Sequence, residues 1–215
     1  MDTNVYTYEG DEVTVTWDRA RCIHAEACVK GLPSVFDPNR RPWIEPDQAE
    51  ADAVEAVVPH CPTGALHLTR NDTNPEPTPD ANRISISPNG PLYVHADAEL
   101  IDSDGETLLT DTRMALCRCG LSDNKPLCDG SHDEGFAADG HIAVNLLSTP
   151  DDADESGPLR IRATEDGPFV VEGPVSITGA DEEISGSRGA LCRCGASGSK
   201  PFCDGSHSEV DFKAD

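Results

Sequence analysis

The stretch CRCGLSDNKPLCDGSH at residues 117–132 returns as CRCGASGSKPFCDGSH at residues 192–207. Both copies keep Cys-x-Cys followed by Gly, a serine two residues later, Lys-Pro and Cys-Asp-Gly-Ser-His at the same spacing. Other positions vary: Leu121 corresponds to Ala196, and Asp123-Asn124 to Gly198-Ser199. The two copies begin 75 residues apart, and a repeat at this spacing predicts small structural units. Small units bury too little apolar surface to be stable without additional stabilisation. A metal centre in each copy would supply that stabilisation.

The nine cysteines fall into three groups of three: Cys22, Cys28 and Cys61; Cys117, Cys119 and Cys128; Cys192, Cys194 and Cys203. The first residues, MDTNVYTYEGDEV, lack the basic start and apolar core of an export signal, and no later apolar run approaches the length of a membrane span. We therefore expect a cytoplasmic protein without a membrane segment. In such a chain, this grouping indicates metal ligands rather than disulfides.

The N-terminal part has mixed secondary-structure signals. Alternation predicts a strand at residues 13–17, and the pattern further along predicts a short helix at 25–32, a helix from Asp47 to Val58, and a strand at 65–68. The proline-rich RNDTNPEPTPDAN then indicates an extended linker. We place a first domain at residues 1–70 and the linker at 71–82.

The remaining sequence is rich in short β-prone runs. They lie at residues 84–87, 92–95, 100–101 and 114–116, and the same order recurs from Leu159. An acidic break, STPDDADESG, separates the copies. The pattern predicts two further domains, at residues 83–147 and 158–215.

The spacing within each copy suits metal binding. Cys117 and Cys119 point to the same side of an extended segment. Cys128 and His132, four residues apart, share one face if Asp129 opens a helical turn. Three cysteines and one histidine also suit a structural zinc site, so ligand type alone does not identify the metal.

Both copies match the pattern C-x-C-x2-S-x3-P-x-C-D-G-S-H and therefore resemble the CDGSH iron-sulfur family. The resemblance implies a 2Fe-2S cluster in each copy. It implies that Cys117 and Cys119 bind one iron and that Cys128 and His132 bind the outer one. Cys192, Cys194, Cys203 and His207 would repeat this arrangement.

Members of this family form dimers with shared strands, so a tandem repeat resembles such a dimer fused into one chain. The expected fold is α+β, with a small ferredoxin-like domain followed by two β-rich CDGSH units that form an intramolecular pseudo-dimer. We expect the chain to be a monomer.

The segments RCIHAEACVKGLPSVFD and PHCPTGALHL resemble a divergent single-cluster bacterial ferredoxin domain over residues 5–69. The usual C-x2-C-x2-C would place a ligand at position 25, which is Ala25 here. Three cysteines, Cys22, Cys28 and Cys61, suit a 3Fe-4S cluster. His24 could complete a 4Fe-4S cluster, and His60 and His67 are weaker candidates.

The charge of −24 with only four lysines argues against a nucleic-acid binder. No nucleophile with a base, phosphate loop or pair of catalytic carboxylates emerges, so an enzyme is not expected. One imidazole in place of a thiolate makes each repeated cluster less negative and easier to reduce. We expect electron transfer to a redox partner protein, with cluster donation to apo-proteins or redox, pH or iron sensing as alternatives.

Overall fold

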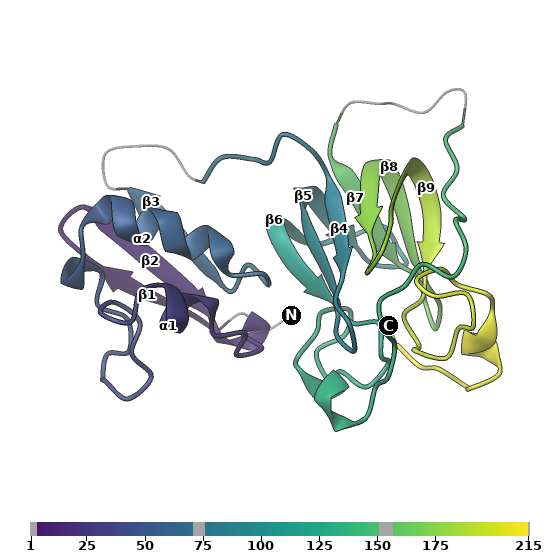
Figure 1. Cartoon of the computed structure of the whole chain (residues 1–215), viewed down its shortest axis with the longest axis horizontal. Helices are drawn as coiled ribbons and strands as arrows, with labels where there is room; N and C mark the ends of the chain where they lie inside the picture. Colours follow the sequence, from purple (N-terminus) through teal and green to yellow (C-terminus); the bar gives the residue numbers. More distant parts are fainter. Residues whose placement is uncertain (1–3, 71–75, 151–156, 215) are drawn as a thin grey trace. The chain divides into compact units, whose positions relative to one another are not determined.

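The computed structural model describes residues 4–70, 76–150 and 157–214 (Figure 1). The chain divides into two compact units, residues 1–77 and 78–215. Residues 71–75 of the predicted linker and residues 151–156 of the predicted second break lie outside the described residues. The first unit contains the N-terminal cysteine group, and the second contains both repeat copies.

The first unit is built on a three-stranded antiparallel sheet. Its strands are β1 (Val5–Glu9), β2 (Val13–Asp18) and β3 (Leu66–Arg70), with β2 in the centre. The alternation that predicted the strand at 13–17 is confirmed in β2, where Val13 and Val15 are buried. These side chains pack with Phe36 and Val54 in the core of this unit.

Short helices lie between β2 and β3. The predicted helix at 25–32 is present as α1 (Ala27–Gly31). The helix predicted from Asp47 is wrong in its start, because Pro46–Gln48 forms a 3-10 turn and α2 (Ala51–Val57) begins after Glu50. Extended backbone at Ala49 separates Asp47 from α2, and the Asp47 carboxylate instead accepts a hydrogen bond from the Asp11 amide at 2.8 Å.

The second unit is mostly β. The first copy contributes β4 (Arg83–Ile86), β5 (Leu92–Ile101) and β6 (Thr107–Leu116), and the second contributes β7 (Leu159–Ala163), β8 (Phe169–Thr178) and β9 (Glu183–Leu191). The runs predicted separately at 92–95 and 100–101 form one strand, β5, whose register with β6 shifts between His95 and Ala98. Burial nevertheless alternates from Leu92 to Leu100, and the two runs are joined by Ala96-Asp97-Ala98-Glu99, residue types that are depleted in strands.

The two copies exchange strands within a six-stranded sheet. The first strand of each copy pairs antiparallel with its own hairpin and parallel with the hairpin of the other copy, so β4 joins β8 and β7 joins β5. Ile84 and Leu100 of the first copy share one buried cluster with Ile161 and Ile177 of the second. Neither copy therefore has a complete core of its own.

The repeated cysteine segments follow the last strand of each hairpin, β6 and β9. Figure 1 shows them, in green and yellow, at the same end of the strands of the second unit. The expected helical turn after Cys128 does not open at Asp129. It is a 3-10 turn over Ser131–Glu134 that follows the left-handed Gly130. Within the described parts of the chain, none of the helices has the length and apolar character to cross a bilayer.

Candidate metal centres

The inner donor pair of the first copy lies where β6 ends. The Sγ atoms of Cys117 and Cys119 are 3.6 Å apart. Backbone hydrogen bonds from Cys117 to Pro126 (3.0 Å) and from Cys128 to Ala115 (2.9 Å) hold the two arms of the loop together. They place Cys128 next to the inner pair.

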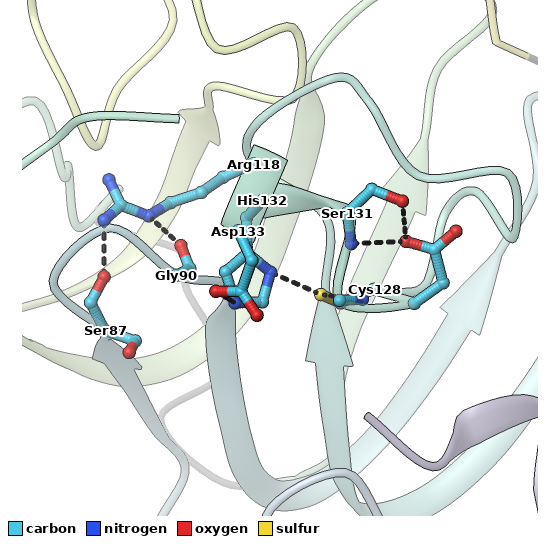
Figure 2. Close-up of polar contacts among 9 residues, drawn as sticks. Ser87, Gly90, Arg118, Cys128, Ser131, His132 and Asp133 are labelled. Carbon is cyan, nitrogen blue, oxygen red and sulfur yellow. Dashed lines mark hydrogen bonds and ion pairs between the residues drawn. The ribbon is translucent and has the colours of Figure 1, made fainter. Parts of the chain in front are cut away.

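The outer donor pair consists of Cys128 and His132. The Nδ1 atom of His132 lies 3.2 Å from the Sγ atom of Cys128 (Figure 2). The 3-10 turn at Ser131–Glu134 brings the imidazole back over the cysteine. The predicted pairing of these two side chains therefore exists, although the turn differs from the one expected.

Two polar side chains of the motif brace the loop. Asp129 accepts hydrogen bonds from the Ser131 amide (3.0 Å), the Ser131 hydroxyl (2.7 Å) and the Asp123 amide (2.8 Å). Although partial burial acts in the opposite direction, these bonds lower the pKa of Asp129. The buried Ser122 hydroxyl donates to the Leu127 carbonyl at 2.7 Å. The motif residues that are not metal donors therefore fix the shape of the loop.

The second copy repeats most of this geometry. The Sγ atoms of Cys192 and Cys194 are 3.8 Å apart, and the Cys203 amide donates to the Ala190 carbonyl at 2.8 Å. His207 differs, because its Nδ1 atom lies 3.5 Å from the Ser208 hydroxyl. Among the described contacts, His207 has no approach to Cys203 like that of His132 to Cys128.

Burial makes one thiol in each copy, that of Cys128 and that of Cys192, reluctant to ionise. It raises the pKa of Cys128 to about 11, with the Cys117 sulfur acting in the same direction, and it raises the pKa of Cys192 to about 11. In the first inner pair, the hydrogen bond between the thiols lowers the pKa of Cys117 to about 6 and raises that of Cys119. Buried thiolates of this kind require a bound cation to offset their charge.

Sequence reasoning missed two buried arginines between the paired cysteines. Arg118 is 2% exposed, and it donates to the carbonyls of Gly90 (2.7 Å) and Ser87 (2.6 Å), as Figure 2 shows. Arg193 is 1% exposed and donates to the Thr164 carbonyl at 2.9 Å. The signal was present, because both copies carry arginine between the paired cysteines.

The lysines of the motif form hydrogen bonds within their own loops. The Nζ atoms of Lys125 and Lys200 donate hydrogen bonds to the carbonyls of Ser122 and Ser197 within their own loops. They therefore brace the loops.

The N-terminal cysteines line one cavity of about 680 Å³ in the first unit. Cys22, Cys28 and Cys61 form part of its wall, together with His24. Burial raises the pKa of Cys28 to about 11, and the sulfurs of Cys61 and Cys22 add to this effect. The structure therefore brings together the three cysteines predicted from distant positions.

Aromatic side chains also line this cavity, a feature that the sequence did not reveal. Trp17 and Trp43 meet edge to face with ring centroids 4.9 Å apart, and Tyr6 lies against Trp17. The Trp17 indole Nε1 is buried, and no described residue accepts its hydrogen. A cluster held by the three cysteines would place sulfur acceptors in the same cavity, so this orphaned donor fits such an occupant.

The donors of the repeated sites also fit their expected group. In a tetrahedral site with bonds of about 2.3 Å, two sulfur ligands of one metal ion lie about 3.8 Å apart. The Sγ separations of 3.6 Å and 3.8 Å match this value, so each inner pair can hold one metal ion. No group of three or more His, Cys, Asp or Glu side chains within the described residues is arranged around a single ion.

Comparisons with known proteins match the N-terminal part and the two repeat copies to two different families. The family model described as "Divergent 4Fe-4S mono-cluster" matches residues 8–71. The model described as "Iron-binding zinc finger CDGSH type" matches residues 89–133 and 166–208.

Two curated relatives resemble the N-terminal part. The "Uncharacterized protein YjdI" of Escherichia coli strain K12 is 36% identical over 66 residues, which cover 31% of this chain and 87% of the relative. The protein of the same name from Escherichia coli O157:H7 gives the same values. No solved structure matches the chain. The chain therefore belongs to the iron-binding CDGSH family, as a tandem CDGSH protein that also carries an N-terminal domain of the divergent 4Fe-4S mono-cluster family.

Proposed function

We propose that this protein is an electron carrier that holds one 2Fe-2S cluster in each CDGSH copy and one 4Fe-4S cluster in its N-terminal domain. The observation that carries the proposal is the arrangement of the first copy in two donor pairs. Cys117 and Cys119 are 3.6 Å apart, and Cys128 and His132 are 3.2 Å apart. Two adjacent pairs provide for two metal ions.

In each copy, one pair of ligands binds each iron of the cluster. Cys117 and Cys119 hold one iron, and Cys128 and His132 hold the other; Cys192 and Cys194, then Cys203 and His207, do the same in the second copy. Clusters with this ligand set supply one-electron redox chemistry. Amide groups of the loops donate to the sulfurs, from Leu121 to Cys119 (3.4 Å) and from Gly130 to Cys128 (3.4 Å). These bonds stabilise negative charge on the thiolates.

In the N-terminal domain, Cys22, Cys28 and Cys61 hold the cluster, and His24 supplies the fourth ligand. His24 lines the cavity with the three cysteines, and its backbone is left-handed with φ of 56°. Such a conformation is uncommon for a residue other than glycine, and it marks functional loops. The 4Fe-4S description of the matching family supports this cluster over a 3Fe-4S one.

The strand exchange supports an intramolecular pseudo-dimer. Each copy places its first strand beside the hairpin of the other, through the parallel pairs β4–β8 and β5–β7. A second chain is not needed to complete this sheet, so the proposed state in solution is a monomer. Its redox partner would be another protein.

Cluster donation to an apo-protein is the second candidate, and the unequal burial of the ligands favours it. Cys117 is 1% exposed and Cys192 is 3% exposed, whereas Cys203 and His207 of the outer pair are half-buried. An acceptor would therefore reach the outer pair of the second copy first.

One experiment separates the two functions. The oxidised protein is mixed anaerobically with a ferredoxin that has been reduced with dithionite, and it is incubated separately with an apo-ferredoxin. Because the histidine-ligated clusters are easier to reduce than all-cysteine clusters, electron carriage predicts reduction of the protein in the first mixture, with its iron retained in the second. Transfer of iron and sulfide to the apo-ferredoxin without electron exchange in the first mixture would replace electron carriage by donation.

A further inference from the structure

The two repeat copies touch each other through the backbone of their inner cysteines. A methyl group added at Gly120 would lie 2.6 Å from the carbonyl oxygen of Cys194, and one added at Gly195 would lie 2.5 Å from that of Cys119. Both glycines have positive φ, 81° and 82°. The contact is therefore reciprocal, and it leaves no room for any side chain larger than hydrogen.

Each of these glycines is joined directly to a proposed ligand. Gly120 follows Cys119, and the next amide, that of Leu121, donates to the Cys119 sulfur at 3.4 Å. In the second copy, the Ala196 amide donates to the Cys194 sulfur at 3.5 Å. A backbone shift at either glycine therefore changes the sulfur environment of its own copy and presses on the ligand backbone of the other.

The glycines beside the outer pairs make no comparable contact. Gly130 and Gly205 also have positive φ, 96° and 92°, but a methyl group at either would meet no heavy atom within 4 Å. Contact between the two metal sites thus occurs at the inner cysteines and not at these outer glycines.

We propose that the two CDGSH sites are coupled, so that occupation of one site strengthens the hold of the other through the contacts of Gly120 with Cys194 and of Gly195 with Cys119. Ligands bound to metal fix the inner backbone of one copy, and closely packed backbone transmits that constraint to the other copy. Thermodynamic linkage makes such coupling mutual, with a typical factor of about 5 to 150 in affinity. The inference rests on the proposal of two 2Fe-2S clusters.

The first test empties one site at a time through its outer ligands. The full-length double variants Cys128→Ala/His132→Ala and Cys203→Ala/His207→Ala are reconstituted with iron and sulfide, as is the wild type. Loss of visible absorbance in excess EDTA is then followed, and the contribution of the N-terminal site is common to all chains. Coupling predicts that the remaining CDGSH cluster is lost roughly tenfold faster than in the wild type. An unchanged rate in both variants would overturn the proposal.

The second test addresses the contact itself. Gly120→Ala is added to the chain whose first site is empty, where the new methyl group can act on the remaining cluster only through Cys194. Gly105→Ala is the matched control, because Gly105 has φ of 89° and its methyl group would meet nothing within 4 Å. We expect faster cluster loss with Gly120→Ala and no change with Gly105→Ala, with circular dichroism verifying the fold.

The outcomes distinguish the proposed coupling of the two sites from the proposed function as an electron carrier. Equal rates for the two glycine variants would contradict the assigned contact. If Gly120→Ala fails to fold, the two emptied-site chains still decide whether the sites are coupled. A wild-type protein without iron would remove the proposed function, whereas two clusters lost independently would remove the coupling alone.

Discussion

The Nε2 atom of His132 lies 3.7 Å from a carboxylate oxygen of Asp133. In the second copy, the residue after His207 is Ser208, which carries no charge. The two sites therefore have the same donors but different charges beside the imidazole. Because a nearby negative charge disfavours the gain of an electron, we expect the first CDGSH site to have the lower reduction potential.

Replacing Asp133 with serine should raise the potential of the first site towards that of the second. The side chain of Asp133 is 90% exposed, so solvent screens its charge, and we expect a shift on the order of tens of millivolts. The reciprocal change, Ser208→Asp, should lower the potential of the second site. Redox titrations of the wild type and the two variants would measure both shifts. Unchanged potentials in both variants would show that the charge at this position does not influence the reduction potential of the sites.

Ser122 should be needed for the stability of its loop. Its hydroxyl is buried, donates to the Leu127 carbonyl at 2.7 Å and accepts from the Asn124 amide at 3.0 Å. Ser122→Ala removes both hydrogen bonds from a buried site, so the free energy of unfolding should fall by about 1–3 kcal/mol. Denaturant unfolding measures this change. Ser85→Ala, at an exposed position of β4, is the control and should cost less than about 0.5 kcal/mol. Equal effects would contradict the assigned role.

One ion pair predicts a pH dependence of stability. The His141 Nδ1 lies 2.8 Å from a carboxylate oxygen of Asp181, and this hydrogen bond, with the charge of Asp139 nearby, raises the pKa of His141. Because the pKa of His141 is higher in the folded state, its protonation stabilises that state. The stabilisation is fully present below the unfolded pKa of about 6.5, and it is lost as the pH rises through the folded pKa. Asp181→Asn should therefore lower the thermal midpoint at about pH 5.5 but not at about pH 9. The opposite dependence would refute the pairing. The effect should be small, because both side chains are exposed.

The nuclearity of the N-terminal cluster can be tested without straining its loop. Asparagine tolerates left-handed backbone, so His24→Asn removes the imidazole and keeps the conformation. We expect the iron content to fall by about one per chain, as a 4Fe-4S cluster becomes 3Fe-4S. Glu26→Asn is the control, because Glu26 is also left-handed, with φ of 60°. Unchanged iron in His24→Asn, measured by chemical analysis, would show that His24 is not a ligand.

Local patterns in the sequence predicted most of the elements. The spacing of Cys117 and Cys119 predicted a close pair, and alternation predicted β2. The Asp47 prediction failed because a capping residue signals the start of a helix only if the following backbone is helical, and Ala49 is extended. The strand β5 appeared as two runs because its middle, Ala96-Asp97-Ala98-Glu99, is made of residue types that are depleted in strands, although its burial alternates.

The sequence did not reveal which distant segments meet in detail, or in what register. The parallel pairing of β4 with β8 joins residues of different copies, and no periodicity reveals register across such a distance. The aromatic wall at Trp17 and Trp43 likewise depends on packing between β2 and a loop. The contact of Gly120 with Cys194 is of the same kind, since the sequence shows a glycine but not what approaches it.

Metal and sulfide analysis of the purified protein tests the central claim most directly. Two 2Fe-2S clusters and one 4Fe-4S cluster predict about eight irons and about eight sulfides per chain, with a brown protein. A colourless protein with stoichiometric zinc and no acid-labile sulfide would contradict the claim, because tetrahedral Cys3His sites also bind zinc.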